Sequence, residues 1–366
     1  MAITLLPAQA RALRMANHGL GRAPMDGALA AAKETGGLQA QNPGAARLGI
    51  RARTRGLDLA EVNKTHDKDR QIVISWLMRS TLHLVPARDL HWLTAFYGPV
   101  ISAKDRTRRH ELGLSDEVCA KALPILQSAL AESGGLTKTA LIARLADDGV
   151  QIEPTGQAPI HLLIYAAACG LICRGPEASP GDPTYVLLDE WVTERAPLTA
   201  AEVVPELARR YFTSFGPATV ADFATWAGIG LGPARQAIAE LGGYLLAVDV
   251  DGTPMYLRDG CQDAAQPAVR LIPAFDNYMF GYRDRSLLVD QAFTGEIYKG
   301  GVARAAVLVD GRIVGTWTQK RTTKLSTVTV DLFEHPARPV RDELAAEAAD
   351  LARFFGLEPA LVLNEP

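Results

Sequence analysis

The chain has 366 residues, of which 48% are hydrophobic and 22% are charged, and its formal net charge is −3. At roughly 150 residues per domain this length predicts two or three units, and the composition is typical of a globular protein. The slightly acidic balance excludes a general attraction to nucleic acid, so any basic surface must be local. The N-terminus lacks the pattern of a signal peptide, and no run reaches the roughly 18 apolar residues that span a membrane. We therefore expect a cytoplasmic protein that does not bind a membrane.

The four cysteines lack the spacing of metal ligands. Cys119, Cys169, Cys173 and Cys261 lie on helix-like or apolar stretches, which fits a reducing compartment. We expect no disulfide, no bound metal and no cofactor.

Two helices are predicted before the first loop, over 7–19 and 26–35, each with a glycine just past its end. A pair of glycines at 36–37 stops the second helix. An Asn-Pro pair at 42–43 has the form of an N-cap followed by proline at the first helical position. The four residues between these signals, 38–41, are therefore predicted to be extended.

The extended stretch contains two glutamines, Gln39 and Gln41. In an extended segment residues i and i+2 point the same way, so both amides can face one cavity. Each amide has an acceptor and a donor, so two of them can hold one water molecule without supplying charge. Such a pair suits a reaction whose leaving group is already activated. Gln39 and Gln41 are our candidate catalytic residues; the alternative is that they are loop residues that cap backbone groups, because Gln-x-Gln is a weak motif.

A cationic stripe is predicted on the helix that follows, over 43–55. Arg47, Arg51 and Arg55 recur every four residues and so share one face of that helix. Such a stripe is either a nucleic-acid contact or a solvated face.

The rest of the chain up to 262 repeats an order of helices followed by a strand or hairpin. A helix is predicted over 67–79 and a strand over 81–85, followed by a helical, basic segment over 86–116. Two later groups of helices, each followed by a hairpin, lie at 117–132, 137–147 and 157–170, and at 199–214, 218–227 and 231–241. This order predicts tandem winged helices, a class that often contacts DNA grooves.

The last hundred residues are β-rich. Strands are predicted at 269–275, 286–289, 303–309, 312–318 and 326–331, and an amphipathic helix at 339–355. The region is locally basic, with Lys299, Arg304, Arg312, Lys320 and Arg321. We therefore predict an α+β fold with four parts: winged helices at 1–116, 117–195 and 196–262, and a β-rich portion with the final helix at 263–366.

Three long motifs bring a family into view: WLMRSTLHLVPARDL (76–90), LIPAFDNYMFGYRDRS (271–286) and GGVARAAVLVDGRIVGTW (300–317). With the glutamine loop, they make nearly the whole chain resemble the AlkZ-like winged-helix DNA glycosylases. The resemblance implies three tandem winged helices in a C-shape with a β-rich portion. It also implies the catalytic role of Gln39 and Gln41, because the AlkZ branch is similar in having glutamine, an apolar residue and glutamine.

The implied activity is that of a monofunctional DNA glycosylase, because the loop has no lysine to form a Schiff base. By resemblance the substrate is double-stranded DNA with bulky N7-alkylguanine adducts made by a DNA-alkylating natural product, and the result is self-resistance. Both monoadducts and interstrand crosslinks are candidate substrates. We expect a monomer that acts on the nucleoid in the cytoplasm.

DNA contacts are expected from the basic residues. Phosphate contacts are assigned to Arg47, Arg51, Lys320 and Arg321, since such side chains neutralise the backbone without reading sequence. The resemblance further places Lys299, Arg304 or Arg312 against a groove, through the turn at 295–301 and the hairpin at 310–311.

Two other classes of protein fit the same sequence. A winged-helix transcriptional regulator would bind one operator tightly, usually as a dimer, whereas a glycosylase would be sequence-tolerant. A non-catalytic resistance protein that binds the free drug would need no basic surface.

Overall fold

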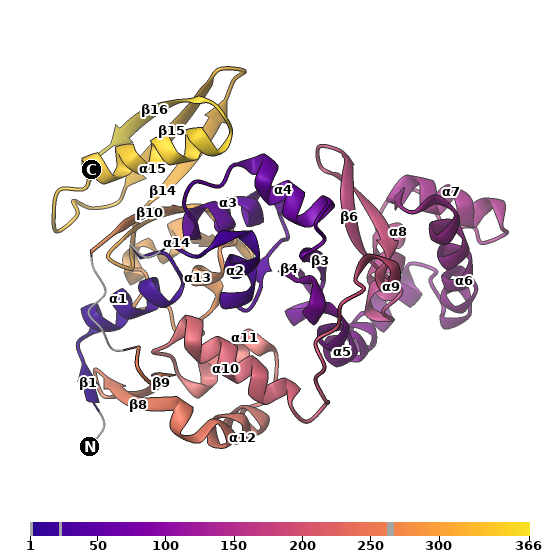
Figure 1. Cartoon of the computed structure of the whole chain (residues 1–366), viewed down its shortest axis with the longest axis horizontal. Helices are drawn as coiled ribbons and strands as arrows, with labels where there is room; N and C mark the ends of the chain where they lie inside the picture. The colour runs from indigo at the N-terminus through magenta and orange to yellow at the C-terminus, as the bar shows by residue number, and fades with distance from the viewer. Residues whose placement is uncertain (1–2, 22–23, 262–266) are drawn as a thin grey trace. The chain divides into compact units, whose positions relative to one another are not determined.

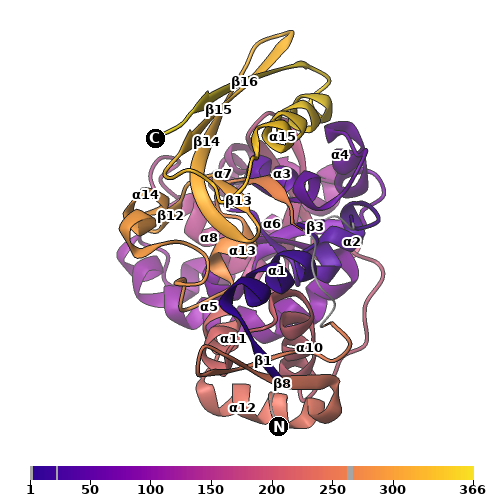
Figure 2. The same cartoon turned by 90° about the vertical axis from the view of Figure 1, so that its left-hand side faces the viewer.

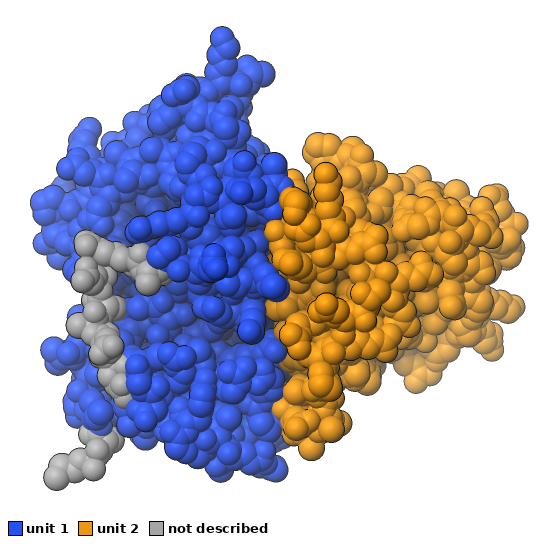
Figure 3. Space-filling view, in the orientation of Figure 1, with its two compact units in different colours: residues 1–62, 204–366 blue, residues 63–203 orange. Residues whose placement is uncertain are grey.

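The computed structural model describes residues 3–21, 24–261 and 267–366. The chain forms two compact units, shown in different colours in Figure 3. The first unit joins Met1–Val62 with Val204–Pro366, and the second is Asn63–Val203. Figure 1 labels the helices and strands.

The first unit begins with the elements that hold the glutamines. They are α1 (Pro7–Asn17), α2 (Gly27–Glu34), the short strand β2 (Leu38–Gln39) and α3 (Pro43–Arg53). The three helices predicted here are confirmed. Helix α4 (Leu59–Asp67) follows and runs across the boundary between the units.

A three-stranded sheet lies beside three helices in the same unit. Strand β1 (Ile3–Leu5) pairs parallel with β8 (Leu245–Val250), which pairs antiparallel with β9 (Thr253–Arg258), as Figure 1 shows. The helices, all predicted, are α10 (Val203–Phe215), α11 (Val220–Ala227) and α12 (Leu231–Leu241).

The C-terminal part of the first unit is a five-stranded sheet covered by one helix. Its strand order is β10-β13-β14-β15-β16, and α15 (Arg341–Phe354) runs along it in Figure 2. The strands are antiparallel except for the parallel pair β15–β16. Their bounds are β10 (Val269–Ile272), β13 (Ala306–Val309), β14 (Arg312–Arg321), β15 (Leu325–Leu332) and β16 (Glu358–Asn364).

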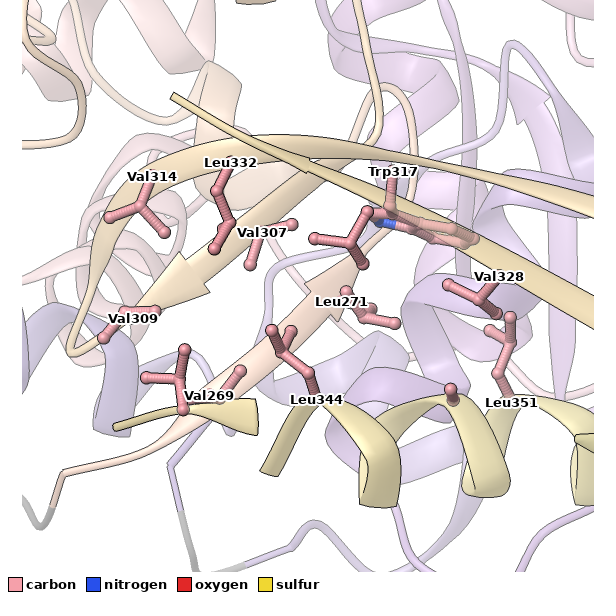
Figure 4. Close-up of a cluster of buried hydrophobic side chains, with 13 residues drawn as sticks. Val269, Leu271, Val307, Val309, Val314, Trp317, Val328, Leu332, Leu344 and Leu351 are labelled. Atoms are coloured by element: carbon pink, nitrogen blue, oxygen red, sulfur yellow. The ribbon is translucent and has the colours of Figure 1, made fainter. Parts of the chain in front are cut away.

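The core of this part forms where the inner face of the sheet meets α15. Alternate strand residues point to one face, so Leu271, Val307 and Trp317 from the sheet pack with Leu344 and Leu351 from the helix (Figure 4). The strand predicted at 286–289 is not formed. Leu288 and Val289 are buried in a turn, where the N–H groups of both donate to the Arg285 carbonyl.

Short elements connect these strands. They are α13 (Asn277–Phe280), η4 (Gln291–Phe293), α14 (Thr294–Ile297), and the two-stranded hairpin of β11 (Tyr298–Lys299) with β12 (Val302–Ala303).

The second unit is a sheet with helices. Its strands lie in the order β4-β3-β6-β7-β5. Side-chain caps begin two of the helices: Ser115 accepts from the Val118 N–H in α6, and Thr137 accepts from the Ala140 N–H in α7. The bounds are β3 (Ile72–Trp76), β4 (Leu82–Pro86), α5 (Leu90–Glu111), α6 (Asp116–Ser133), β5 (Leu136–Thr137), α7 (Lys138–Asp147), α8 (Ala158–Ala168), β6 (Ile172–Ser179), β7 (Asp182–Leu187) and α9 (Leu188–Trp191).

The helix predicted over 67–79 is wrong. Helix α4 ends at Asp67, and 72–76 is the strand β3, buried along its whole length. Arg70, between them, has φ +53, which interrupts a helix. The run Ile72-Val73-Ile74 is β-branched, and such side chains favour strands.

The predicted α+β class is confirmed by this mixture of helices and strands. The order helix, short strand, helix, helix, hairpin runs from α6 to β7 and is typical of a winged helix. The assignment of winged helices to 1–116, 117–195 and 196–262 stays a prediction. Across the described parts of the chain, helices fall short of the length and apolar character that crossing a membrane requires.

The α15 interface allows a direct test of the core. Leu344 has no exposed surface, so Leu344→Ala is expected to lower the free energy of unfolding by about 2–5 kcal/mol through lost burial and a cavity. Leu325 in the same sheet is 38% exposed, and Leu325→Ala should cost about 0.5 kcal/mol or less. Urea denaturation of both variants measures the difference; equal losses would contradict this account of the core.

Candidate active site around the glutamine loop

The two glycines before the loop end α2 in the way the sequence predicts. Gly36 has φ +69 and Gly37 has φ +96, values that favour glycine. The Gly36 N–H donates to the Lys33 carbonyl at 3.2 Å and the Gly37 N–H to the Ala32 carbonyl at 2.8 Å, which is a Schellman motif. The chain therefore leaves α2 abruptly and enters β2.

The start of α3 is also as predicted. The Asn42 side chain accepts a hydrogen bond from the Ala45 N–H at 3.1 Å, and Pro43 occupies the first turn. The catalytic candidates are thus held between two defined helix ends.

The two glutamines lie in different environments. Gln39 is 9% exposed, on the buried strand β2, whereas Gln41 is exposed beside the cap of α3. Gln39 lines a narrow recess, together with Ala45 and Ala46 of α3 and with Pro273 and Phe275 of the segment after β10. Gln41 is outside the lining of that recess, so the structure does not place both amides in it.

The side-chain oxygen of Gln39 is the unusual atom of the site. Gln39 Oε1 is buried and has no hydrogen-bond partner among the described residues. A buried acceptor left in this way costs about 1–3 kcal/mol, and most buried polar atoms in proteins are paired. An acceptor kept at that cost is a candidate for binding a donor that arrives with the substrate.

The backbone of Gln39 is fixed by a residue far away in the sequence. The Gln39 N–H donates to Asn277 Oδ1 at 2.8 Å, and Asn277 Nδ2 donates to the Gly37 carbonyl. Asn277 is 5% exposed and begins α13. One side-chain amide therefore binds the loop on both sides of Leu38.

A buried ion pair lies next to this amide. Arg53, at the end of α3, donates through Nη1 and Nη2 to the two carboxylate oxygens of Asp276, each at 2.7 Å, and both side chains are fully buried. Arg53 also donates to the Gly49 carbonyl at 3.0 Å. Asp276 in turn accepts from the Tyr278 N–H at 2.9 Å and so caps α13. This pair ties α3 to the segment that contains Asn277.

His18 completes the buried network. Its ring is fully buried against Phe215 and Tyr278, with ring centroids 4.2 and 5.2 Å apart. Burial, and then the positive charges of Arg53 and Arg14, hold the pKa of His18 well below its usual value. Its Nδ1 lies 3.5 Å from Arg53 Nη2, where a neutral ring can accept. His18 is therefore suited to support Arg53 and not to supply a proton.

Arg51 does not occupy the expected position on a cationic surface. It is 2% exposed, its Nη1 lies 3.2 Å from both Glu347 and Asp350, and its Nη2 donates to the Leu271 carbonyl at 2.6 Å. A buried guanidinium with these partners conflicts with the predicted phosphate contact. The predicted stripe is thus broken in the middle: Arg47 is half-buried and Arg55 is exposed.

A larger recess, of about 320 Å³, lies at the C-terminal end of α3 and does not include the glutamines. Arg51, Arg53, Glu347 and Asp350 are among its lining residues. Three of its arginines, Arg51, Arg53 and Arg270, are already paired with carboxylates, and a helix C-terminus disfavours anions. This recess is therefore a poor phosphate site.

Four other basic candidates lie at or near the surface. Lys320 and Arg321 are exposed at the end of β14, where the Arg321 guanidinium lies 4.0 Å from the Phe355 ring centroid. Arg304 is 48% exposed and 3.6 Å from Glu296, and Arg312 lies 3.4 Å from Asp290 and from Glu334.

The two predicted groove-contacting turns differ in accessibility. The β11–β12 turn is exposed at Lys299, Gly300 and Gly301. The Asp310-Gly311 turn instead packs on α1: a Cβ on Gly311 would lie 2.6 Å from the Arg11 carbonyl oxygen. This burial conflicts with the expectation that the 310–311 turn reaches a groove.

The chain is similar to known proteins in sequence and in fold. The family described as DNA glycosylase AlkZ-like matches residues 32–354. The interstrand DNA cross-link repair glycosylase of Streptomyces sahachiroi is 26% identical over 354 residues, covering 88% of this chain and 89% of that protein. The solved structure of Streptomyces sahachiroi DNA glycosylase AlkZ is similar with a TM-score of 0.78 and 23% identity, over 99% of this chain and 100% of that chain, which shows a shared fold.

These findings define the class of the protein: it is a DNA glycosylase, an enzyme whose substrate is DNA. Within that class, the chain belongs to the AlkZ-like family, whose match covers most of its length. Catalysis is therefore favoured over the two alternatives, a transcriptional regulator and a protein that sequesters a drug.

Sequence reasoning missed the residues that support the glutamine loop. Asp276 and Asn277 lie within the motif at 271–286, but their role depends on contacts with Arg53 and Gln39, more than 220 residues away. The available signal was the pair of polar residues inside the apolar part of the motif, 271–282, because a buried polar residue needs a partner.

The ion pair allows a matched stability test. Arg53→Met leaves the Asp276 carboxylate buried without its partner and should lower the free energy of unfolding by about 3–5 kcal/mol. Arg304→Met removes an exposed pair with Glu296 in the same unit and should cost at most about 1 kcal/mol. Denaturant titration compares the two, and a small loss for Arg53→Met would show that the buried pair is dispensable.

Proposed function

We propose that the protein excises N7-alkylguanine adducts, including interstrand crosslinks made through that atom, from double-stranded DNA by hydrolysis of the glycosidic bond. The observation that supports this most is Gln39, whose buried Oε1 has no partner among the described residues. The relative from Streptomyces sahachiroi is named for the repair of interstrand DNA crosslinks. The proposed product is an abasic site without a strand break.

The chemistry matches an uncharged site. Alkylation at N7 makes guanine cationic, so the base departs without being protonated. The bond between C1′ and N9 breaks, its electron pair neutralises the base, water oxygen bonds to C1′, and the released proton passes to solvent. What remains for the protein is to orient the water and to stabilise the positive charge that grows on the sugar.

We assign complementary roles to the two glutamines. Gln39 Oε1 accepts a hydrogen bond from the attacking water and directs its carbonyl dipole toward the sugar. Gln41, which is exposed, makes the second contact from the side where DNA enters. The buried glutamine thus fixes the geometry and the exposed one completes it when the substrate is bound.

We propose that basic residues on the surface of the first unit bind the DNA backbone. Arg47, Lys320 and Arg321 contact phosphates, and Lys299, Arg304 or Arg312 lies at a groove, with the exposed β11–β12 turn beside the DNA. Arg51 is left out of this interface because it is buried and paired.

The same proposal includes the domain organisation of the chain and its role in the cell. The chain comprises winged helices at 1–116, 117–195 and 196–262 with a β-rich portion at 263–366, and it acts as a monomer on the nucleoid in the cytoplasm. Its cellular role is self-resistance to a DNA-alkylating natural product.

The glutamines give the first functional test. Gln39→Ala and Gln41→Ala should each lower the single-turnover rate of excision by roughly 100-fold or more, since each removes positioning of one water molecule. DNA affinity and melting temperature should change little. The double variant should be far less than multiplicatively worse, because both residues act on the same water.

Two further variants sharpen this test. Gln41→Asp supplies a carboxylate that can accept a proton from the water and should keep measurable excision. Gln127→Ala removes an exposed glutamine from α6 and should excise at the wild-type rate. Near-normal excision by the single alanine variants at 39 and 41 would mean that these residues are not catalytic.

The proposed interface predicts a change in salt dependence. Lys320→Ala should reduce the slope of log affinity against log salt concentration by about 0.9, the contribution of one phosphate contact. Its affinity should fall equally for DNA of different sequence. Fluorescence anisotropy between low and moderate salt measures both quantities, and unchanged slopes for Lys320, Arg321 and Arg47 variants would remove all three from the interface.

A further inference from the structure

We infer that Asn277 is a positioning residue for catalysis, which fixes the backbone of Gln39 by taking the place of a neighbouring β-strand. This inference rests on the proposed function, in which Gln39 orients the attacking water. Asn277 does not touch the reacting atoms in this scheme; it acts through Gln39.

The two hydrogen bonds of Asn277 have the pattern of a parallel strand. In a parallel pair, a residue on the first strand makes two bonds to the second strand. Its carbonyl accepts from an N–H there, and its own N–H donates to the carbonyl two residues before that N–H. Asn277 Oδ1 accepts from the Gln39 N–H at 2.8 Å, and Asn277 Nδ2 donates to the Gly37 carbonyl. A single side chain thereby imposes strand geometry on the residues from Gly37 to Gln39.

The loop needs this restraint because its own sequence supplies little rigidity. Strand β2 has only two residues, Leu38 and Gln39, and it follows two glycines. Glycine has more conformational freedom than any other residue, so the two glycines themselves do little to set the direction of Gln39. The Schellman motif restrains the N–H groups of Gly36 and Gly37, and Asn277 restrains the next carbonyl and N–H.

Asn277 is itself held firmly. The preceding residue, Asp276, is fixed by its ion pair with Arg53 and by its cap on the Tyr278 N–H. Phe275, one residue earlier, has φ +61, which is strained for a bulky side chain. Such strain persists only where the surroundings determine the backbone, and it is common at functional sites. Asn277 thus lies in a segment whose backbone is fixed at the residues on both sides of it.

The orientation of the Asn277 amide is determined by its partners. Turning the amide over would set Nδ2 against the Gln39 N–H and Oδ1 against the Gly37 carbonyl, which places donor against donor and acceptor against acceptor. Aspartate at this position would keep the acceptor for Gln39 and lose the donor for Gly37. Alanine would lose both.

The experiment measures single-turnover excision from a duplex oligonucleotide that has N7-guanine adducts of a nitrogen mustard. Asn277→Ala should lower the excision rate roughly 10- to 100-fold, as expected for a misplaced catalytic group, with little change in DNA affinity. Hydrogen exchange at the backbone N–H of Gln39 should accelerate, because this group loses its acceptor. Asn277→Asp should also lower the rate, because it keeps the acceptor for the Gln39 N–H but sets a second carboxylate oxygen against the Gly37 carbonyl, acceptor against acceptor.

A double-mutant cycle separates positioning from general stabilisation. In a Gln39→Ala background, Asn277→Ala should cause less than about a twofold further loss, because the residue that it positions is gone. The matched control is Asn17→Ala, which removes another side-chain amide that donates to a backbone carbonyl, that of Gly216 at 2.9 Å. This control should keep the wild-type rate even where its melting temperature falls.

The outcomes distinguish the inference from the proposed function. Failure of the wild-type protein to excise the adduct would overturn the proposed function, whereas wild-type excision by Gln39→Ala would overturn the catalytic role of Gln39 and with it the role of Asn277. Loss of excision in Gln39→Ala with normal rates in both Asn277 variants would overturn only the positioning role. A multiplicative loss in the double variant would also overturn it. If Asn277→Ala does not fold, the rate and exchange of Asn277→Asp decide, and a normal rate there rejects the inference.

Discussion

The candidate site depends on one buried ion pair, between Arg53 and Asp276. Neither side chain has contact with solvent, so the loss of hydration must be offset by good geometry and by further hydrogen bonds. Both conditions are met, because the pair is bidentate and each partner makes another bond, to the Gly49 carbonyl and from the Tyr278 N–H. Since Arg53 ends the helix that follows the glutamines and Asp276 precedes Asn277, the pair sets the position of the loop from both sides.

The charge balance of this network explains how an uncharged site can be built beside charged residues. Asp276 lines the same recess as Gln39, but its carboxylate is occupied by Arg53. His18 stays neutral next to Arg53, because burial and two nearby guanidinium groups lower its pKa. The polar groups left for chemistry are therefore amides. A cationic leaving base needs no proton from the protein, so dipoles that orient water are sufficient, and a second positive charge would oppose its reaction.

Local signals in the sequence predicted much of this arrangement. The glycines at 36–37, the Asn42 cap and Pro43 each act within a few residues, and the structure confirms them. Two predictions were wrong, because the local pattern did not decide the structure there. The apolar run at 72–76 has the length and composition of either a short helix or a strand, and its β-branched residues form the strand β3. Arg51 was expected at the surface by helical spacing, but it pairs with Glu347 and Asp350, almost 300 residues later.

The two glutamines differ in burial, and their spacing in the sequence does not predict this difference. Alternation along an extended chain predicts that Gln39 and Gln41 point the same way, yet regular strand structure ends at Gln39, and the α3 cap, Asn42, follows directly after Gln41. The Gln39 side chain consequently lies in the protein interior, on a backbone that Asn277 holds, and the Gln41 side chain lies at the surface. A buried amide keeps its geometry whether or not DNA is bound, whereas an exposed amide can adjust to the DNA. Under the proposed function, catalysis by such a pair becomes selective when the adduct itself brings the sugar into reach of both, because neither glutamine has a charge with which to attract an unmodified nucleotide.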